Sequence, residues 1–337
     1  MHDILQKLQY QINLSAAEMR SAMLAIMNGG VSDKDICSFL SALNSKGFTV
    51  EEVTSAAMVM REYVVPVQTG CSSVFDIVGT GGDAQHSFNI STAAAFVIAA
   101  AGVKVAKHGN RSVSSLCGSA DVLEALGINI AIPHEYLPDC LNETGIIFLF
   151  AQRHHPAMKH VAPARQSLGV KTIFNVLGPL TNPAFATHQM MGVYSHALVE
   201  PMAHVLKNLG AQRVVVVHST DGLDEVSTAS TTFISEVINS GIRSYEVTPE
   251  SFGFTRATGT DFKGGNKDVN AVILRAILSG EKGPKRDIVV MNAAFGLYGA
   301  GIVDSPSNGV VLAERMIDSG EALHKLEQLK EFTNRGC

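Results

Sequence analysis

The apolar residues of the first sixty positions recur at the three- and four-residue spacing of amphipathic helices. These apolar side chains are Leu5, Leu8, Ile12, Leu14, Met19, Met23, Ile26, Ile36, Leu40, Leu43, Val53, Ala57 and Met60. Because residues three or four apart share a helix face, each stripe can pack against a neighbouring helix. Ser15 followed by Glu18 adds the pattern of a capping box, which starts a helix. Residues 1–65 are therefore predicted to form a small helical domain.

Beyond a crossing at residues 63–70 that contains Pro66, short apolar runs alternate with helical stretches. The strand-like runs are Val74–Val78, Val103–Ala106, Ile128–Ile132, Ile146–Phe150 and Arg213–His218. The helical stretches are Ala93–Ala101, Ala120–Leu126 and His134–Glu143. Such alternation favours a mostly parallel central sheet that is flanked by helices. The predicted fold class is therefore α/β, with a small all-helical domain joined to a larger α/β domain.

A loop with three glycines follows the first strand-like run. It reads Gly79–Asp83 and leads through Ser87 to a helix that begins near Asn89, Ser91 and Thr92. Glycines let an anion approach backbone N–H groups closely, and a helix N-terminus attracts negative charge. The loop matches neither the P-loop nor the dinucleotide-binding motif. We interpret it as a phosphate cradle, although a strand-to-helix turn without any ligand has a similar composition.

Two further loops follow strand-like runs and carry groups that suit a phosphate. Lys107–Ser115 offers two permanent cations, an imidazole, an amide and three hydroxyls, which can all donate hydrogen bonds. Asp224 and Glu225 end the segment Ser219–Glu225, and adjacent carboxylates of this kind bind Mg²⁺. A polar surface loop and an acidic surface turn would have the same compositions. Because ligands of such sheets sit at the carboxyl ends of strands, we expect the three loops to share one sheet edge.

Charge and composition exclude several classes of function. The net charge of -5 argues against a general nucleic-acid binder, which needs a basic surface. The five cysteines are widely separated without a Cys-x-x-Cys pair, so we expect neither a zinc site nor disulfides, and a reducing cytoplasm fits best. Residues 1–15 lack the apolar core of a signal peptide, and the apolar run Ala93–Val103 is too short to span a bilayer. His154, His155 and His160 do not share one helix face, which disfavours a metal site there.

Five segments of the chain together carry a family resemblance. They are Gly79–Asp83, Lys107–Ser115, His155–Met158, Asn175–Pro183 and Asp221–Glu225. In this order they closely resemble the anthranilate phosphoribosyltransferase family, and the match spans nearly the whole chain. Members of that family transfer the phosphoribosyl group of phosphoribosyl pyrophosphate (PRPP) to the amine of anthranilate. The products are N-(5-phosphoribosyl)anthranilate and pyrophosphate, in the second step of tryptophan biosynthesis from chorismate.

The resemblance implies a domain organisation and a set of partners. Residues 1–65, joined by about 163–187, would form the helical domain, and residues 70–162 with 188–337 the α/β domain that binds PRPP. The resemblance also implies a cytoplasmic homodimer formed through the helical domain. Two Mg²⁺ ions per active site are expected, and neither nucleic acid nor a membrane is an expected partner.

The resemblance also implies which residues contact the substrates and the metal. PRPP is expected at Gly79, Gly82, Asp83, Ser87, Asn89, Ile90, Ser91, Thr92, Lys107, His108, Gly109, Asn110, Arg111, Ser112, Val113, Ser114, Ser115 and Ser119. Anthranilate is expected at Gly79, Asn110 and Arg165. Mg²⁺ is expected at Ser91, Asp224 and Glu225. The expected catalytic residues are Lys107, Asn110 and Arg165.

The chemistry expected at these residues is the loss of pyrophosphate through an oxocarbenium-like transition state. Mg²⁺, the glycine-loop N–H groups and Lys107 would stabilise the leaving group. The amine of anthranilate is an uncharged nucleophile, so no strong general base is required, and His108 is a candidate proton acceptor. Arg165 offers a planar fork for the carboxylate. Ser87 and Lys171 depart from the family pattern, in which threonine and arginine are more usual, without changing the metal or phosphate chemistry.

Two other functions fit parts of the sequence. A pyrimidine nucleoside phosphorylase shares the implied fold and uses free phosphate, but it would not need the Asp224–Glu225 metal pair. A relative that has lost catalysis and binds nucleic acid would show a basic groove and damaged metal residues. Mg²⁺ dependence distinguishes the first alternative from the expected enzyme, and a salt-dependent interaction with DNA would indicate the second.

Overall fold

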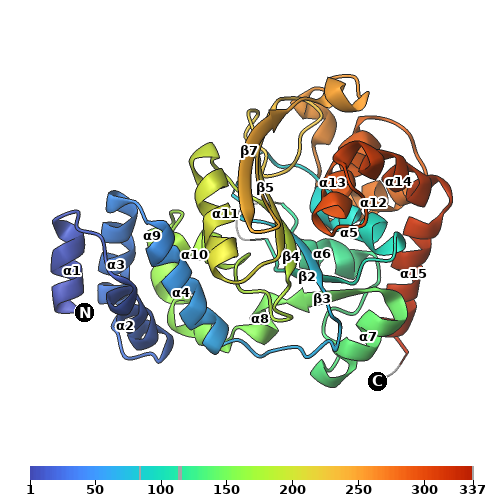
Figure 1. Ribbon diagram of the computed structural model, residues 1–337. Helices are drawn as coiled ribbons and strands as arrows, with labels where there is room; N and C mark the ends of the chain where they lie inside the picture. The colour runs from blue at the N-terminus through green and yellow to red at the C-terminus, as the bar shows by residue number, and fades with distance from the viewer. Residues whose placement is uncertain (83–84, 113–115, 336–337) are drawn as a thin grey trace.

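The larger part of the chain is built around a single seven-stranded sheet (Figure 1). The computed structural model describes residues 1–82, 85–112 and 116–335. The strands are β1 Phe75–Gly79, β2 Val105–Gly109, β3 Ile146–Phe150, β4 His188–Gly192, β5 Arg213–Ser219, β6 Thr232–Ile238 and β7 Gly241–Val247. Their order in the sheet is β3-β2-β1-β4-β5-β6-β7. The first five strands are parallel, and β6 and β7 extend the sheet antiparallel, so the predicted α/β class with a mostly parallel sheet is confirmed.

Four helices at the N-terminus form the predicted bundle, at the left of Figure 1. They are α1 His2–Gln9, α2 Ala16–Met27, α3 Asp33–Lys46 and α4 Val50–Glu62. The capping box of Ser15 and Glu18 starts α2 as predicted, with both reciprocal hydrogen bonds present. Ser32 caps α3 through the Asp35 N–H, which is the weaker form of the same motif.

Most of the remaining helices surround the sheet. The α-helices are α5 Ile90–Ala100, α6 Ser119–Ala125, α7 Leu137–Thr144, α8 Ala151–His154, α9 Ala162–Leu168, α10 Ile173–Leu177, α11 Val199–Asn208, α12 Lys267–Leu278, α13 Pro284–Gly299, α14 Pro306–Asp318 and α15 Glu321–Thr333. Short 3₁₀ turns occupy His134–Tyr136, Pro156–His160, His196–Leu198, Pro249–Phe252 and Gly259–Phe262. Among the described residues, no helix has the length and apolar character needed to cross a membrane.

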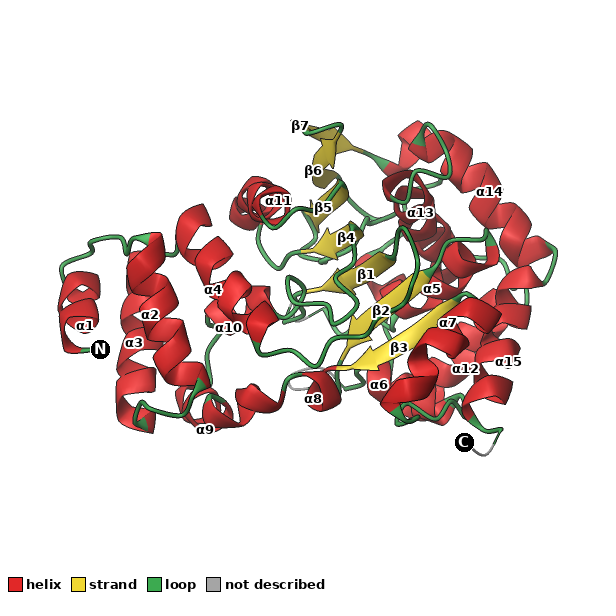
Figure 2. Cartoon of the chain, turned by 60° about the horizontal axis from the view of Figure 1, so that its bottom comes forward, coloured by secondary structure: helices red, strands yellow, loops and turns green. Residues whose placement is uncertain are grey.

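The two faces of the sheet belong to two hydrophobic cores. On β5, Val215 and Val217 face a core shared with α5 and α13. Val214 and Val216 point the opposite way, into a core shared with α11 and the N-terminal bundle. This alternation follows from the period of two along a strand. Figure 2 shows the bundle on one side of the sheet and α5, α13 and α15 on the other.

Two segments from the middle of the chain return to the bundle. Helix α9 packs against α3, and α10 packs against α3 and α4. Their buried side chains Val161, Ala164, Ile173, Phe174, Val176 and Leu177 belong to the bundle core. Arg61 on α4 adds polar contacts, because its guanidinium donates to the carbonyls of Leu180 (2.8 Å) and Leu209 (3.1 Å).

One predicted strand is wrong. Ile128–Ile132 does not join the sheet, although Ile128, Ile130 and Ile132 are all buried. Its backbone N–H groups find other acceptors: Ile128 donates to the Leu123 carbonyl, and Asn129 donates to the Thr333 hydroxyl of α15. The apolar alternation therefore reflects packing under the C-terminal helix, which sequence spacing alone does not distinguish from pairing in a sheet.

A buried ion pair holds the helical bundle together. The Glu52 side chain is fully buried and accepts hydrogen bonds from the N–H groups of Leu14 and Thr49, both at 2.8 Å. Lys46 donates to the same carboxylate at 2.9 Å, and its side chain is only 3% exposed. Glu52 thus satisfies three donors from three separate segments of the bundle.

Replacing Glu52 with alanine is expected to lower the free energy of unfolding by roughly 3–5 kcal/mol, because the buried Lys46 would lose its only carboxylate among the described residues and keep only neutral acceptors, Asn13 and the Gly47 carbonyl. Urea denaturation followed by circular dichroism measures this change. Glu51→Ala is the control, since Glu51 is exposed on the same helical turn and its loss should matter by less than about 0.5 kcal/mol. Equal stability of the two variants would contradict the role assigned to Glu52.

Candidate active site

The three predicted loops meet at one edge of the sheet. They follow β1, β2 and β5, which run parallel within the order β2-β1-β4-β5, so their carboxyl ends point the same way. Two contacts join the loops directly. The Gly81 N–H donates to Asp224 Oδ2 at 2.9 Å, and the Ser91 N–H at the start of α5 donates to Glu225 Oε1 at 3.2 Å. The acidic pair therefore touches both the glycine loop and a helix N-terminus.

Asp224 can approach the sheet this closely only because two strands end in glycine. A Cβ atom on Gly79 would lie 2.4 Å from Asp224 Oδ2, and one on Gly192 would lie 1.7 Å from the Asp224 carbonyl oxygen. Both distances are shorter than van der Waals contact. Gly81 and Gly82 have positive φ angles of 63° and 72°, which disfavour any residue with a side chain. The glycines of this loop are thus required by local geometry.

The acidic loop is held in place by a buried asparagine of α13. Asn292 accepts from the Val226 N–H and donates to the Val226 carbonyl, both at 2.9 Å. The Asp221 carboxylate accepts from the Ser227 hydroxyl at 2.6 Å and so closes the turn from within. Asn292 lies 66 residues away from its partner and was not predicted from the sequence. The only sequence signal was a polar amide within the apolar run 288–297 of this helix.

Asn89 lies at the N-cap of α5 as predicted, but its side chain makes no capping hydrogen bond. Its amide instead donates to the Cys117 carbonyl at 3.2 Å and accepts from the Asn270 amide of α12 at 3.0 Å. The Asn89 side chain therefore ties the start of α5 to α12 and to Cys117, and it does not cap the helix. Ile90 and Thr92, also predicted here, bury their side chains beneath the loop.

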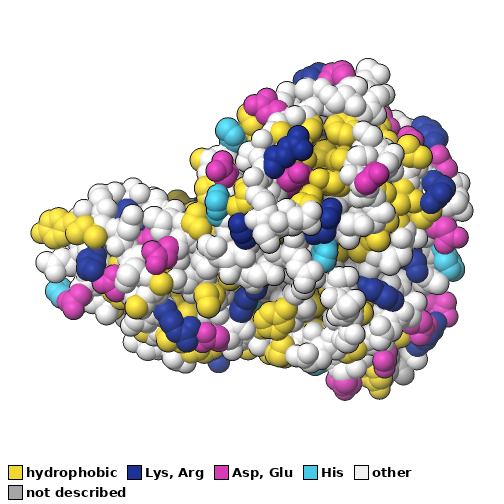
Figure 3. Space-filling model, in the orientation of Figure 1, with side chains coloured by type: hydrophobic (Ala, Val, Ile, Leu, Met, Phe, Trp, Pro, Cys, Tyr) yellow, Lys and Arg dark blue, Asp and Glu magenta, His cyan; other side chains and the backbone are white. Residues whose placement is uncertain are grey.

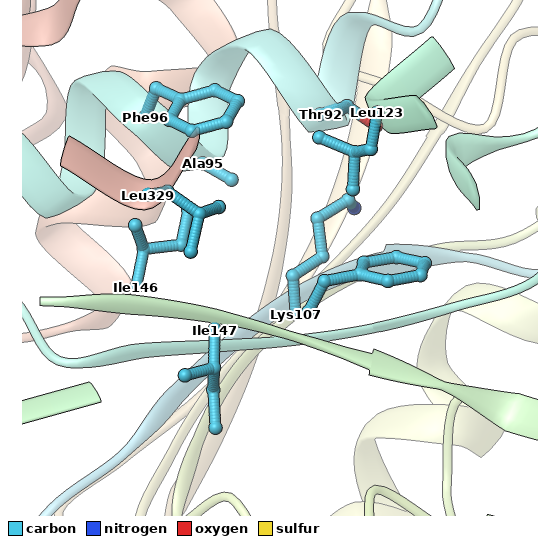
Figure 4. A pocket seen from close by; sticks show the side chains of 9 residues that line it. Thr92, Ala95, Phe96, Lys107, Leu123, Ile146, Ile147 and Leu329 are labelled. Carbon is cyan, nitrogen blue, oxygen red and sulfur yellow. The ribbon is translucent and has the colours of Figure 1, made fainter. Parts of the chain in front are cut away.

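Lys107 on β2 connects this strand to β1 and to the start of α5. Its buried ammonium donates to the Ile77 carbonyl at 2.6 Å and to the Ser91 hydroxyl at 3.2 Å. Burial lowers the pKa of Lys107, while the negative charges of Asp76, Glu225 and Asp224 act in the opposite direction. The side chain also lines a small cavity between α5 and β3 (Figure 4). With a volume of about 10 Å³, that cavity is too small for a substrate.

A fully buried carboxylate, Asp76, lies next to Lys107 in the sheet. It accepts from the His108 N–H at 3.1 Å and from the Asn182 amide at 2.8 Å. Asn182 also donates to the Ala106 carbonyl, so the segment around Asn182 is tied to the strands of the site. Burial raises the pKa of Asp76 to about 6, although Asn182 and the Lys107 charge partly oppose this rise. Asp76 was not among the predicted site residues, because one acid inside an apolar run gives no chemical pattern.

Two histidines form a buried pair beside this network. The Nε2 atoms of His108 and His155 lie 3.2 Å apart. Burial lowers the pKa of both imidazoles, to about 4 for His155 and well below the ordinary value for His108. His154 turns away and contacts the Val65 carbonyl through Nδ1, whereas His160 lies against Gly29 of the bundle. His154, His155 and His160 therefore occupy three different environments.

The loop after β2 makes its contacts mainly with α6. Arg111 binds Glu124 through both terminal nitrogens, at 2.6 and 2.8 Å, and also contacts Asp121 at 3.0 Å. The Ser112 N–H donates to Asp121, and the Ser119 hydroxyl donates to the Asn110 carbonyl. A Cβ atom on Gly109 would lie 2.3 Å from that same hydroxyl. Asp83, Val113, Ser114 and Ser115 were also predicted here but lie outside the described residues.

Two other predicted residues lie at the margins of the sheet edge. Ser87 forms an isolated bridge with Lys263. Arg165 is on α9, on the bundle side of the molecule, with its guanidinium 5.7 Å from the centre of the Phe174 ring. Burial lowers the pKa of Arg165, and within the described part of the chain no carboxylate forms an ion pair with it. The structure thus separates Arg165 from the loops that hold Asp224 and Glu225.

Known sequences and structures show the same architecture. The chain matches a glycosyl transferase family helical bundle domain over residues 2–64 and a glycosyl transferase family a/b domain over residues 72–323. It is 49% identical over 336 residues to the anthranilate phosphoribosyltransferase of Geotalea daltonii, covering 96% of each chain. It is 51% identical over 322 residues to that of Acetivibrio thermocellus, covering 96% of this chain and 93% of the relative.

Three solved structures agree with this similarity. Anthranilate phosphoribosyltransferase from Thermus thermophilus superposes with a TM-score of 0.93 and 44% identity, covering 98% of this chain and 99% of the other. The enzyme from Saccharomyces cerevisiae in complex with PRPP and Mg gives 0.90 and 29%. Its complex with 4-fluoroanthranilate gives 0.88 and 28%, and each yeast structure covers 98% of this chain and 97% of its own. The chain therefore belongs to the anthranilate phosphoribosyltransferases of this glycosyl transferase family.

Proposed function

We propose that this chain transfers the phosphoribosyl group of PRPP to the amine of anthranilate and releases pyrophosphate. The observation that carries the proposal is the position of Asp224 and Glu225, whose carboxylates are hydrogen bonded to the glycine loop and to the start of α5. A nucleoside phosphorylase using free phosphate has no need of such a pair. The yeast relative has been solved with PRPP and Mg, and this chain retains an acidic pair suited to that metal.

The residues present fit a magnesium site that is completed by substrate. Asp224, Glu225 and the Ser91 hydroxyl supply hard oxygen ligands, and we propose that they hold two Mg²⁺ ions. Among the described residues no cluster of three or more His, Cys, Asp or Glu side chains could hold a metal by itself. Mg²⁺ commonly uses one or two carboxylates and takes its remaining ligands from substrate phosphates and water. When bound, Mg²⁺ would neutralise the charge that develops on pyrophosphate.

The chain's own groups would assist departure of pyrophosphate from C1 of the ribose. The glycine-loop N–H groups and the α5 N-terminus favour negative charge at the sheet edge. Lys107 adds a positive charge below the Ser91 hydroxyl, and its contacts keep it fixed during the reaction. Fixed donors of this kind need little reorganisation as the leaving group gains charge. Asn110 and the rest of the loop after β2 would hold the ribose phosphate.

Arg165 would bind the carboxylate of anthranilate with its planar fork. Gly79 and Asn110 would contact the same substrate from the sheet edge. The bundle, with residues 163–187, and the α/β domain therefore carry different substrates in this proposal. The crossing at residues 63–70 is the expected hinge, and closure about it would bring anthranilate to C1 of the ribose.

We also infer a cytoplasmic homodimer. Tyr10 and Ile12 at the end of α1 are 71% and 49% exposed, which supports contact through the helical domain. The five widely separated cysteines suit a reducing compartment. The face in Figure 3 carries scattered charges of both signs, in keeping with small-molecule substrates and not nucleic acid.

Arg165→Ala is expected to raise the apparent KM for anthranilate by roughly 10–100-fold, because a charge-assisted contact of about 1.5–3 kcal/mol is lost. The KM for PRPP should change little. Following the decay of anthranilate fluorescence at varied concentrations of each substrate measures both constants. An unchanged KM for anthranilate would remove Arg165 from the site.

Asp224→Asn together with Glu225→Gln is expected to lower turnover by at least about 10²–10³, since the charge that holds Mg²⁺ is removed while the side-chain shape is kept. The same fluorescence assay, with and without EDTA, measures the loss. Glu250→Gln is a matched control, because Glu250 forms an exposed pair with Arg256 away from the sheet edge. Turnover of the double variant near the wild-type rate would exclude these residues as metal ligands.

A further inference from the structure

Lys171 reaches from the bundle side of the molecule to the glycine loop. It lies between α9 and α10, and its carbonyl accepts a hydrogen bond from the Asn44 amide of α3. Its side chain extends away from this anchor, with Cε only 3.0 Å from the place that a Cβ atom on Gly82 would occupy. The Lys171 ammonium lies 4.0 Å from the centre of the Tyr194 ring. A residue fixed to the bundle thus carries its charge to the loop predicted to hold phosphate.

The contacts of the Lys171 ammonium are weak ones. Within the described part of the chain it forms no ion pair, and it lies over the Tyr194 ring, while Cε of the same side chain lies beside Gly82. Tyr194 is half-buried, and a cation over such a ring contributes about 0.5–2 kcal/mol, compared with about 1.5–3 kcal/mol for a hydrogen bond to a charged group. Tyr194 itself is fixed to the same loop, because its N–H donates to the Thr80 hydroxyl at 3.0 Å. The ring therefore holds the ammonium beside the loop without competing strongly for it.

Two cations of β2 and its following loop are already engaged. Lys107 donates to Ile77 and Ser91, and Arg111 is paired with Glu124 and Asp121. Pyrophosphate carries several negative charges, and Asp224 and Glu225 add two more at the same edge. The proposed Mg²⁺ ions offset part of this negative charge, and a further cation that can turn toward the glycine loop would add to the stabilisation of the bound group.

We propose that Lys171 is a binding residue for the pyrophosphate group of PRPP, contributed from the bundle side of the molecule. The proposal rests on the proposed function, because it assumes that the glycine loop holds this group. Rotation of the Lys171 side chain from the Tyr194 ring toward the loop would bring its ammonium to the phosphate oxygens. Gly82 next to it has a φ of 72°, which disfavours any residue with a side chain.

Isothermal titration calorimetry with inorganic pyrophosphate and Mg²⁺ tests this role without turnover. Lys171→Met should weaken binding by about ten-fold, since a charged hydrogen bond is lost while the aliphatic stem over Gly82 is kept. Lys171→Arg should bind within about three-fold of wild type. Lys159→Met is the matched control, because Lys159 is an exposed lysine of the same connecting region and should leave the affinity unchanged.

The outcomes separate the two proposals. Equal affinity for pyrophosphate in wild type and Lys171→Met would overturn the role of Lys171 and leave the proposed function standing. Absence of binding in wild type would overturn both proposals. Thermal unfolding of each variant checks that the fold is kept, and Lys171→Gln replaces the methionine variant if that one unfolds. A lowered melting temperature with unchanged affinity would show that Lys171 only packs on the loop.

Discussion

The candidate site depends on one close approach, that of Asp224 to the glycine ends of β1 and β4. The absence of side chains on Gly79 and Gly192 lets the backbone and carboxylate of Asp224 lie directly on the sheet edge. From there Asp224 accepts from Gly81, and the next residue, Glu225, accepts from the first turn of α5. Any larger residue at these strand ends would displace the acidic loop outward. Both contacts, and the metal site proposed on them, would then be lost together.

Two charged side chains are buried in the strands next to that edge. Asp76 and Lys107 are both buried. Lys107 donates to a carbonyl of β1, and Asp76 accepts from the amide of Asn182. Burying an unpaired charge is unfavourable, so such groups persist only where hydrogen bonds and an opposite charge compensate. The compensation here comes from elements that also form the site. The buried network therefore fixes the relative positions of β1, β2 and the segment around Asn182.

The sequence predicted local features well and distant partners poorly. The positive φ angles of Gly81 and Gly82 are those that glycine adopts readily, so they follow from residue type. The shared edge of the loops after β1, β2 and β5 follows from the common direction of these strands. Ile128–Ile132 was mistaken for a strand because the acceptor of its Asn129 N–H, Thr333, lies 204 residues later. The side chain of Asn89 likewise bonds to Cys117 and Asn270, which no local pattern specifies. Polar groups whose partners come from other elements form their hydrogen bonds only in the folded chain. The spacing of residues along the sequence does not predict these partners.

The division of charge between the two parts of the molecule bears on how substrates would move them. Lys107 and Arg111, on the sheet side, already have partners, whereas Arg165 and Lys171, on the bundle side, form no ion pair within the described part of the chain. PRPP and anthranilate are both anions, and the acidic pair adds negative charge at the sheet edge. Apart from the proposed Mg²⁺ ions, positive charge for the substrates would therefore come largely from the bundle side. Anion binding at the sheet edge would then draw the bundle inward, so that closure follows from the same electrostatics that hold the substrates.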